Sequence, residues 1–211
     1  MGVEITWINH ASFRLAGSRV VYVDPWKISG SARDGNVVFL SHSHFDHCSA
    51  EDVAKVRAAD GVVVGPADAL AQVGGGQALA PGKTVEAGGV KVTGVAAYNV
   101  GKHFHPKSND WLGAVFEMDG VRVYYAGDTD RLPEMAELKG IDVALLPVGG
   151  TYTMDAAEAA RAAADIGCEA AIPYHFGDIV GSAGDAKKFA DAAPCTVHVL
   201  KPRGKVTIQA E

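Results

Sequence analysis

Short apolar runs, separated by glycine, aspartate and proline, fill the first half of the chain. β-Branched and aromatic residues dominate these runs, and this composition favours strands over helices. The pattern therefore predicts a β-rich first half. The expected strands cover Val3–Ile8, Ser12–Leu15, Arg19–Val23, Val37–Leu40, Val62–Val64, Ala78–Leu79, Thr84–Ala87 and Val90–Ala97.

The second half alternates between apolar runs and helical patterns. Asp119-Gly120 separates two of these runs, and this dipeptide is a strong signal for the two-residue turn of a hairpin. The strands expected here cover Leu112–Met118, Val121–Ala126, Val143–Pro147, Ala170–Pro173, Val197–Leu200 and Val206–Gln209. Along the whole chain, helices are expected from the N-cap Ser49 to about Asp60, and over Pro66–Val73, Leu132–Leu138, Asp155–Ile166 and Asp185–Ala192.

Each half thus consists of a β-rich stretch followed by mixed strands and helices. Because a sheet must bury one face against another layer, this order predicts two sheets packed face to face with helices outside. The expected fold is α/β, a four-layer αββα sandwich. No polar or low-complexity linker divides the 211 residues, so residues 1–211 are expected to form one domain.

Composition and charge narrow the range of partners. The chain has 19 Lys and Arg against 25 Asp and Glu, and its net charge of −6 disfavours binding to a long nucleic acid. No stretch approaches the ~18–20 apolar residues of a spanning helix, so membrane insertion is not expected. The first residues do not resemble a signal peptide, and the three cysteines form no CxxC pair. These features predict a cytoplasmic protein with reduced thiols.

Histidine is concentrated in one segment. The pattern His-x-His-x-Asp-His follows the apolar run Val37–Leu40. Residues two apart share a face of an extended backbone, so His42, His44 and Asp46 are expected to converge, and a turn brings His47 beside them. Three imidazoles and a carboxylate are costly to bury together without a cation. The segment therefore predicts a metal site for Zn²⁺, Mn²⁺ or Fe²⁺.

Two further residues of metal-ligating type follow apolar strands. Asp128 comes after the run Val121–Ala126, and His175 comes after Ala170–Pro173. The ends of strands that share a core can meet at one rim, where sites form in layered α/β proteins. We therefore expect Asp128 and His175 to complete the site.

Together these motifs resemble the metallo-β-lactamase superfamily. More narrowly, they resemble its small metal-dependent hydrolases related to ascorbate-phosphate lactonases and to the phospholipase D that cleaves N-acyl-phosphatidylethanolamine. The similar segments span nearly the whole chain, and His-x-His-x-Asp-His is the most specific of them. The others are Trp7-x-x-His10-Ala11-Ser12-Phe13, Asp24-Pro25-Trp26, Gly127-Asp128-Thr129, Pro147-Val148-Gly149-Gly150 and Pro173-Tyr174-His175-Phe176-Gly177.

The resemblance implies the metallo-β-lactamase fold and a site for two divalent metal ions. Zinc is the expected metal, with manganese and iron as alternatives. The ligands that the resemblance implies are His42 and His44 for the first ion, Asp46, His47 and His175 for the second, and Asp128 as the bridge.

One implied ligand of the first ion has no obvious counterpart. The superfamily normally has a third histidine at the end of the strand expected over Val90–Ala97, where this chain has Asn99. His103 and His105 follow in the same loop. We expect His105 to reach the site, because Pro106 restricts its backbone, with His103 as second choice and Asn99 lining the site. The alternative that neither His103 nor His105 binds metal stays open.

Some residues are expected just outside the ligands. A metal-bound imidazole usually donates its other N–H to a carboxylate or carbonyl, and Asp24 and His10 are candidates for this supporting role. Asp24 is equally compatible with an ordinary turn before Pro25. Thr151 follows the turn Gly149-Gly150 and is expected to line the pocket or bind substrate.

These inferences predict a hydrolase in which a hydroxide shared by two ions attacks a small ester, with Asp46 orienting it or accepting its proton. A lactone or other carboxylic ester and a phosphodiester both fit. A small anion held by the ions with Lys102 or Lys107 fits as well. The alternative is a non-hydrolytic metal-binding or di-iron redox protein, although di-iron relatives usually have glutamate in the first motif, where this chain has His44. The sequence predicts no oligomeric state.

Overall fold

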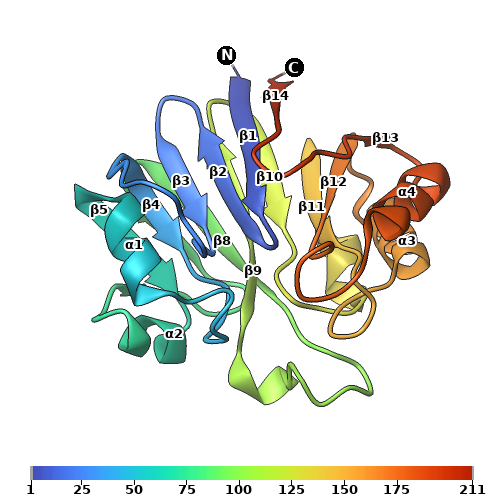
Figure 1. Cartoon of the computed structure of the whole chain (residues 1–211), viewed down its shortest axis with the longest axis horizontal. Coiled ribbons are helices and arrows are strands. Elements are labelled where there is room, and N and C mark those ends of the chain that lie inside the picture. The colour runs from blue at the N-terminus through green and yellow to red at the C-terminus, as the bar shows by residue number, and fades with distance from the viewer. Residues whose placement is uncertain (1, 211) are drawn as a thin grey trace.

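Two seven-stranded mixed sheets lie face to face in the computed structural model, which describes residues 2–210 (Figure 1). The first sheet has the strand order β14-β1-β2-β3-β4-β5-β6. Its strands are β1 (Gly2–Asn9), β2 (Ser12–Ala16), β3 (Val20–Val23), β4 (Gly35–Phe39), β5 (Arg57–Gly65), β6 (Gln77–Ala78) and β14 (Lys205–Gln209).

The second sheet has the strand order β13-β12-β11-β10-β9-β8-β7. Asp119 and Gly120 form the predicted turn between β9 and β10, with φ of 54° and 78°, the left-handed values that a tight hairpin turn requires. The strands are β7 (Thr84–Ala87), β8 (Val90–Ala96), β9 (Leu112–Met118), β10 (Val121–Tyr125), β11 (Val143–Pro147), β12 (Ala170–Tyr174) and β13 (Thr196–Val197).

Both sheets have the same pairing pattern. In the first sheet, the pairs from β14 to β3 are antiparallel and those from β3 to β6 are parallel. In the second sheet, the pairs from β7 to β10 are antiparallel and those from β10 to β13 are parallel. The carboxyl ends of the parallel strands within a sheet therefore lie at one edge, a place where α/β proteins commonly build sites.

Helices cover the outer faces of both sheets (Figure 1). On the first sheet, α1 (Ala50–Val56) contacts β4 and α2 (Ala67–Gln72) contacts β5. On the second sheet, α3 (Ala156–Ile166) contacts β11 and α4 (Ala183–Ala192) contacts β12. The predicted αββα sandwich is thus confirmed. Within residues 2–210, no helix combines the length and apolar composition needed to cross a membrane.

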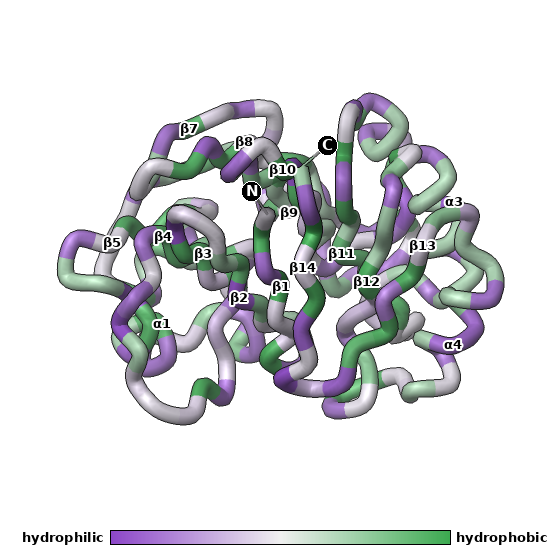
Figure 2. Tube along the Cα trace, turned by 90° about the horizontal axis from the view of Figure 1, so that it is seen from above, coloured by the Kyte–Doolittle hydropathy of each residue, from purple (hydrophilic) through white to green (hydrophobic). Residues whose placement is uncertain are grey.

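Aromatic side chains join the inner faces of the two sheets. Phe39 of β4 meets Phe116 of β9 with ring centroids 5.4 Å apart, and Phe13 of β2 meets Tyr174 of β12 at 5.5 Å. These rings belong to one buried apolar core that draws on both sheets. In Figure 2 hydrophobic and hydrophilic residues alternate along β1, and hydrophilic residues are frequent in the peripheral loops. Burial of this core holds the strand ends of both sheets in fixed relative positions.

The first helix is shorter than the one expected from Ser49 to about Asp60. The N-cap is as expected, since the Ser49 hydroxyl accepts from the N–H of Asp52 at 3.2 Å. However, α1 ends at Val56, and the following residues form β5. Pairing with β4, which begins opposite Arg57, overrides the local helical pattern.

Two other elements differ from the expectation. The helix predicted over Leu132–Leu138 is the 3₁₀ helix η2 (Pro133–Glu137). The strand predicted over Val197–Leu200 is reduced to the two residues of β13, because only Thr196 and Val197 pair with β12.

Candidate metal centre

The chemistry-bearing residues meet at one edge of the sandwich, where strands of both sheets end. Asp24 follows β3 and His42 follows β4 in the first sheet, whereas Asp128 follows β10 and His175 follows β12 in the second. His10 lies in the turn between β1 and β2. The fold therefore collects side chains that are far apart in sequence at a common rim.

His42, His44 and His105 form what we call the three-histidine group. One ring nitrogen of each lies within 4.8 Å of those of the other two, and His42 Nε2 is 3.0 Å from His44 Nδ1. The indole of Trp111 packs against all three rings, with centroid distances of 4.9, 4.9 and 5.6 Å. Burial lowers the pKa of His42 well below its usual value and that of His105 to about 4. Both imidazoles are thus neutral near pH 7, the form that binds metal.

Asn99 orients His105 within the three-histidine group. The Asn99 Oδ1 accepts from the backbone N–H of His105 at 3.1 Å and from its Nδ1 at 2.9 Å. The Asn99 Nδ2 donates to Asp130 Oδ1 at 3.1 Å and to the Tyr152 carbonyl at 2.9 Å. Because Nδ1 is engaged, the Nε2 atom of His105 is left for the site. Asn99 therefore lies behind the histidine.

His10, Asp46, His47 and His175 form what we call the aspartate–histidine group. Each offers one ligand atom, and these atoms lie within 4.8 Å of one another. His10 Nε2 lies 3.1 Å from Asp46 Oδ2, and the rings of His10 and His175 are 4.1 Å apart. All four residues are buried. His10 thus contacts Asp46 directly, and its supporting role stays a prediction.

Asp24 lies at the centre of a buried hydrogen-bond network beneath both groups. Its Oδ2 accepts from His47 Nδ1 at 2.7 Å, from the Tyr125 hydroxyl at 2.7 Å and from the Ser41 hydroxyl at 2.5 Å. Its Oδ1 accepts from the Ser41 N–H at 2.7 Å. Burial opposes charge on His47, but the carboxylates of Asp128 and Asp24 outweigh it and raise the pKa of His47 well above its usual value. Asp24 therefore fixes the His47 ring with Nε2 toward the site.

Asp128 lies between the two groups. Its Oδ2 is 3.1 Å from His175 Nε2 and 3.4 Å from His105 Nε2, and its Oδ1 is 3.5 Å from His47 Nε2. Burial alone would raise the pKa of Asp128, but His175 and His47 hold it well below its usual value. An ionised carboxylate thus faces histidines of both groups.

Several of these buried atoms have no hydrogen-bond partner. They are the Nε2 atoms of His47, His105 and His175 and the Oδ1 atom of Asp128. A buried polar atom without a partner costs free energy, so each such atom in a native protein requires an explanation. These are donor atoms of the types that Zn²⁺, Mn²⁺ and Fe²⁺ accept, and they face a common space. The residues present therefore fit divalent ions.

Three residues of the site have a strained backbone. His10, Asp24 and His175 have φ of 37°, 42° and 62°, which side-chain-bearing residues rarely adopt. Each such conformation costs on the order of 1–3 kcal/mol and persists only where the surroundings impose it. Here the strain aims the three side chains at the rim. Strain of this kind is commonly found at functional sites.

The backbone of the histidine-rich segment turns earlier than expected. The N–H of His47 donates to the His44 carbonyl at 3.0 Å, so the chain is not extended beyond His44. The prediction that His42, His44 and Asp46 share one face of an extended backbone is therefore wrong for Asp46. The turn instead sends Asp46 and His47 into the second group. One short segment thus supplies both groups.

Some predicted residues do not join the site. His103 is exposed and lines no part of the pocket described below. Thr151 is exposed as well, and its neighbour Tyr152 lines the pocket instead. Lys102 is bound to Asp130 Oδ1 at 2.6 Å. Loop geometry, which the sequence does not reveal, selects Tyr152 over Thr151 and His105 over His103.

Sequence reasoning overlooked Ser41, Tyr125 and Trp111. Ser41 and Tyr125 bind Asp24, and Trp111 covers the three-histidine group. A weak signal existed for the first two, because Ser41 directly precedes His42 and Tyr125 ends the strand before Asp128. Nothing in the sequence marks Trp111, which precedes β9 and meets the histidines only in the folded chain.

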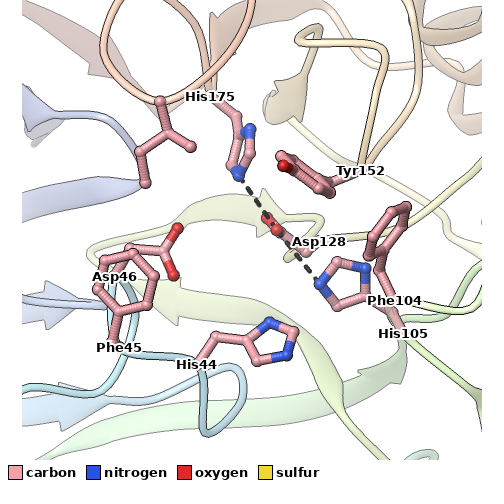
Figure 3. Close-up of a pocket in the computed structure, with 9 residues that line it drawn as sticks. His44, Phe45, Asp46, Phe104, His105, Asp128, Tyr152 and His175 are labelled. Atoms are coloured by element: carbon pink, nitrogen blue, oxygen red, sulfur yellow. Dashed lines mark ion pairs between the residues drawn. The ribbon is translucent and has the colours of Figure 1, made fainter.

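A pocket of about 240 Å³ opens above the two groups (Figure 3). The figure shows Asp128 between His175 and His105, with His44 and Asp46 on the facing side. A polar floor under an open pocket gives a small molecule access to the buried donor atoms. The residues that line it are His44, Phe45, Asp46, Phe104, His105, Asp128, Tyr152, His175 and Ile179.

Comparisons with known proteins identify the family of this chain. A family profile described as "Beta-lactamase superfamily domain" matches residues 4–175. A metal-dependent hydrolase of Methanoregula boonei is 36% identical over 90% of this chain and 89% of its own length. One from Methanosphaerula palustris is 35% identical over 98% of this chain and all of its own length.

Solved structures give the same result. A proposed metal-dependent hydrolase from Parabacteroides distasonis is 30% identical, with a TM-score of 0.82 over 93% of this chain and 91% of its own. The predicted likeness to the superfamily is therefore confirmed. The narrower likeness to ascorbate-phosphate lactonases and to the phospholipase D stays a prediction.

Proposed function

This chain belongs to the metallo-β-lactamase superfamily and to its metal-dependent hydrolases, and on that premise we propose that it hydrolyses a small ester at a site for two divalent ions. The observation that carries the proposal is the set of buried donor atoms without hydrogen-bond partners, which gather around Asp128 below an open pocket. A packing role would leave these atoms unsatisfied.

We assign one ion to each group. His42, His44 and His105 would hold the first ion, and Asp46, His47 and His175 would hold the second. Asp128 would bridge them, because its two oxygens face histidines of both groups. Zinc suits this imidazole-rich donor set, and manganese or iron are the alternatives.

The protein's own residues then have distinct tasks. Bound divalent ions supply Lewis acidity and lower the pKa of water toward ~7. Asp46 lines the pocket and is held through Oδ2 by His10, which makes it the group placed to orient water or accept its proton. Asn99 and Asp24 keep His105 and His47 in the orientation that frees Nε2.

The proposal is tested by elemental analysis of the purified protein and assay against lactones, p-nitrophenyl esters and bis-phosphodiesters. We expect close to two equivalents of a divalent metal and turnover of at least one ester class. Turnover that persists after complete metal removal would overturn the proposal. Visible absorption from bound iron without hydrolysis would favour the di-iron redox alternative instead.

A further inference from the structure

Exposed apolar side chains gather around the mouth of the pocket. Five large apolar residues within residues 2–210 are exposed, namely Phe45, Val100, Phe104, Ile179 and Val199. Three of the five, Phe45, Phe104 and Ile179, line this one pocket. Phe45 is 71% exposed, which is unusual for a phenylalanine because contact of its ring with water costs free energy. Apolar clusters of this kind on a protein surface usually mark a binding site.

The apolar residues lie on two sides of the polar floor of the pocket, which Asp128 helps to form. Phe45 packs edge-on against Trp26, with centroids 5.9 Å apart, and Phe104 packs edge-on against Tyr152 at 4.7 Å. Figure 3 shows Phe45 on one side of Asp128, and Phe104 with Tyr152 on the other. A molecule with its reactive bond over Asp128 would therefore meet an aromatic side chain in both directions.

Among residues 2–210, no lysine or arginine lines the pocket. The nearby lysines are already paired with carboxylates among the described residues: Lys102 with Asp130 at 2.6 Å, Lys107 with Glu134 at 3.2 Å and Lys27 with Asp178 at 2.8 Å. The expectation that Lys102 or Lys107 helps to bind an anionic substrate therefore has no support in the structure. A charged group at the rim would lose water without gaining a partner.

From these observations we infer that the pocket selects small substrates that carry neutral, apolar groups on both sides of the bond that is cut. One group would contact Phe45, and the other would pack against Phe104 and Tyr152. The inference rests on the proposed function and deepens it, because it specifies the groups that flank the ester that is cut. The volume of about 240 Å³ is below the ~300–1,000 Å³ of pockets for drug-sized ligands, so the substituents are short.

A matched pair of esters tests the inference on the metal-loaded protein. Ethyl hexanoate and monoethyl adipate have the same length and differ by a terminal carboxylate. We expect kcat/KM to be at least tenfold higher for ethyl hexanoate, because the carboxylate would be desolvated among aromatic rings. Equal values, or a preference for monoethyl adipate, would overturn the inference.

Substitutions show whether the aromatic rim causes the preference. Phe45→Ala and Phe104→Ala should each reduce the ratio of the two kcat/KM values by about fourfold, the effect of roughly one buried methylene. Val199→Ala is the matched control, because Val199 is 46% exposed and lies outside the pocket lining. Thermal melting checks that each variant is folded. If both phenylalanine variants keep the full preference for ethyl hexanoate over monoethyl adipate, the aromatic side chains at the rim do not cause it.

A binding measurement separates this inference from the proposed function. Hexanamide and adipamic acid repeat the matched pair as amides, and saturation-transfer NMR reports their contact with the protein without turnover. Stronger transfer to hexanamide, reduced by Phe104→Ala, supports the apolar rim even if neither ester is hydrolysed, in which case only the proposed ester hydrolysis fails. Equal transfer to both amides overturns the apolar rim even if the esters are hydrolysed.

Discussion

The three-histidine group and the aspartate–histidine group share Asp128 but are built differently. The first consists of neutral imidazoles packed against one indole, and its third member comes from the loop between β8 and β9. The second contains a carboxylate, has His47 bonded directly to the buried Asp24, and includes the strained backbones of His10 and His175. Asp24 reaches the first group only through the Ser41 hydroxyl, which contacts His42. Only the second is thus fixed by the ends of strands in both sheets.

This difference implies unequal metal sites. A carboxylate ligand and a hydrogen-bonded carboxylate behind an imidazole both increase the basicity of the ligand set. The aspartate–histidine group has both, whereas the three-histidine group depends on the neutral amide of Asn99 for the orientation of His105. We therefore expect the aspartate–histidine group to hold its ion more tightly.

The largest expected effect is that of a chelator. Complete removal of metal should abolish turnover, and added Zn²⁺ should restore it. At limiting chelator, one equivalent should leave before the other, because the two groups differ in ligand charge. Metal content by mass spectrometry, measured beside the rate, gives both quantities. Simultaneous loss of both equivalents at every chelator concentration would contradict the inequality of the two groups.

Removal of one ligand should have the next largest effect. His42→Ala should lower metal content from about two equivalents to about one, and kcat/KM should fall by more than the ~10–100-fold typical of outer-shell changes. His175→Ala should remove the ion of the other group. The two variants should differ in the affinity of the ion that remains, with tighter binding in His42→Ala. The reverse order would contradict the comparison.

Asp24→Asn keeps the shape of the side chain but removes its charge. We expect metal affinity at the aspartate–histidine group to fall by ~10–100-fold, because His47 loses its carboxylate partner. The melting temperature should also fall, since Ser41 and Tyr125 share that acceptor. Competition with a chromophoric chelator measures the affinity. An effect confined to the weaker site would show that Asp24 does not support His47.

Asn99→Ala should have the smallest effect, about a tenfold loss of affinity at the three-histidine group alone. His105 would lose the acceptor that fixes its ring, whereas the aspartate–histidine group would be untouched. His103→Ala is the matched control, since His103 lies in the same loop and is exposed. Metal titration of the two variants decides whether loop orientation matters. Equal losses in both would assign the effect to the loop as a whole.

Most of the strands and the αββα order were predictable, because alternating and β-branched apolar runs report which faces become buried. The end of α1 was not, because β5 forms by pairing with β4, a partner distant in sequence. In the same way, strand ends indicated Asp128 and His175, whereas the left-handed conformation of His175 was invisible. Local patterns therefore predicted the kinds of element and of ligand.

The sequence by itself determined the chemistry available to this protein: a dense histidine–aspartate motif and isolated candidate ligands at strand ends. Only the tertiary structure decided how these side chains are divided between the three-histidine group and the aspartate–histidine group. The turn at His44 separates His42 and His44 from Asp46 and His47, and Asn99 draws His105 rather than His103 toward the first group. The physical reason is that donor convergence depends on backbone turns and hydrogen bonds between distant segments, which packing of the shared core brings together.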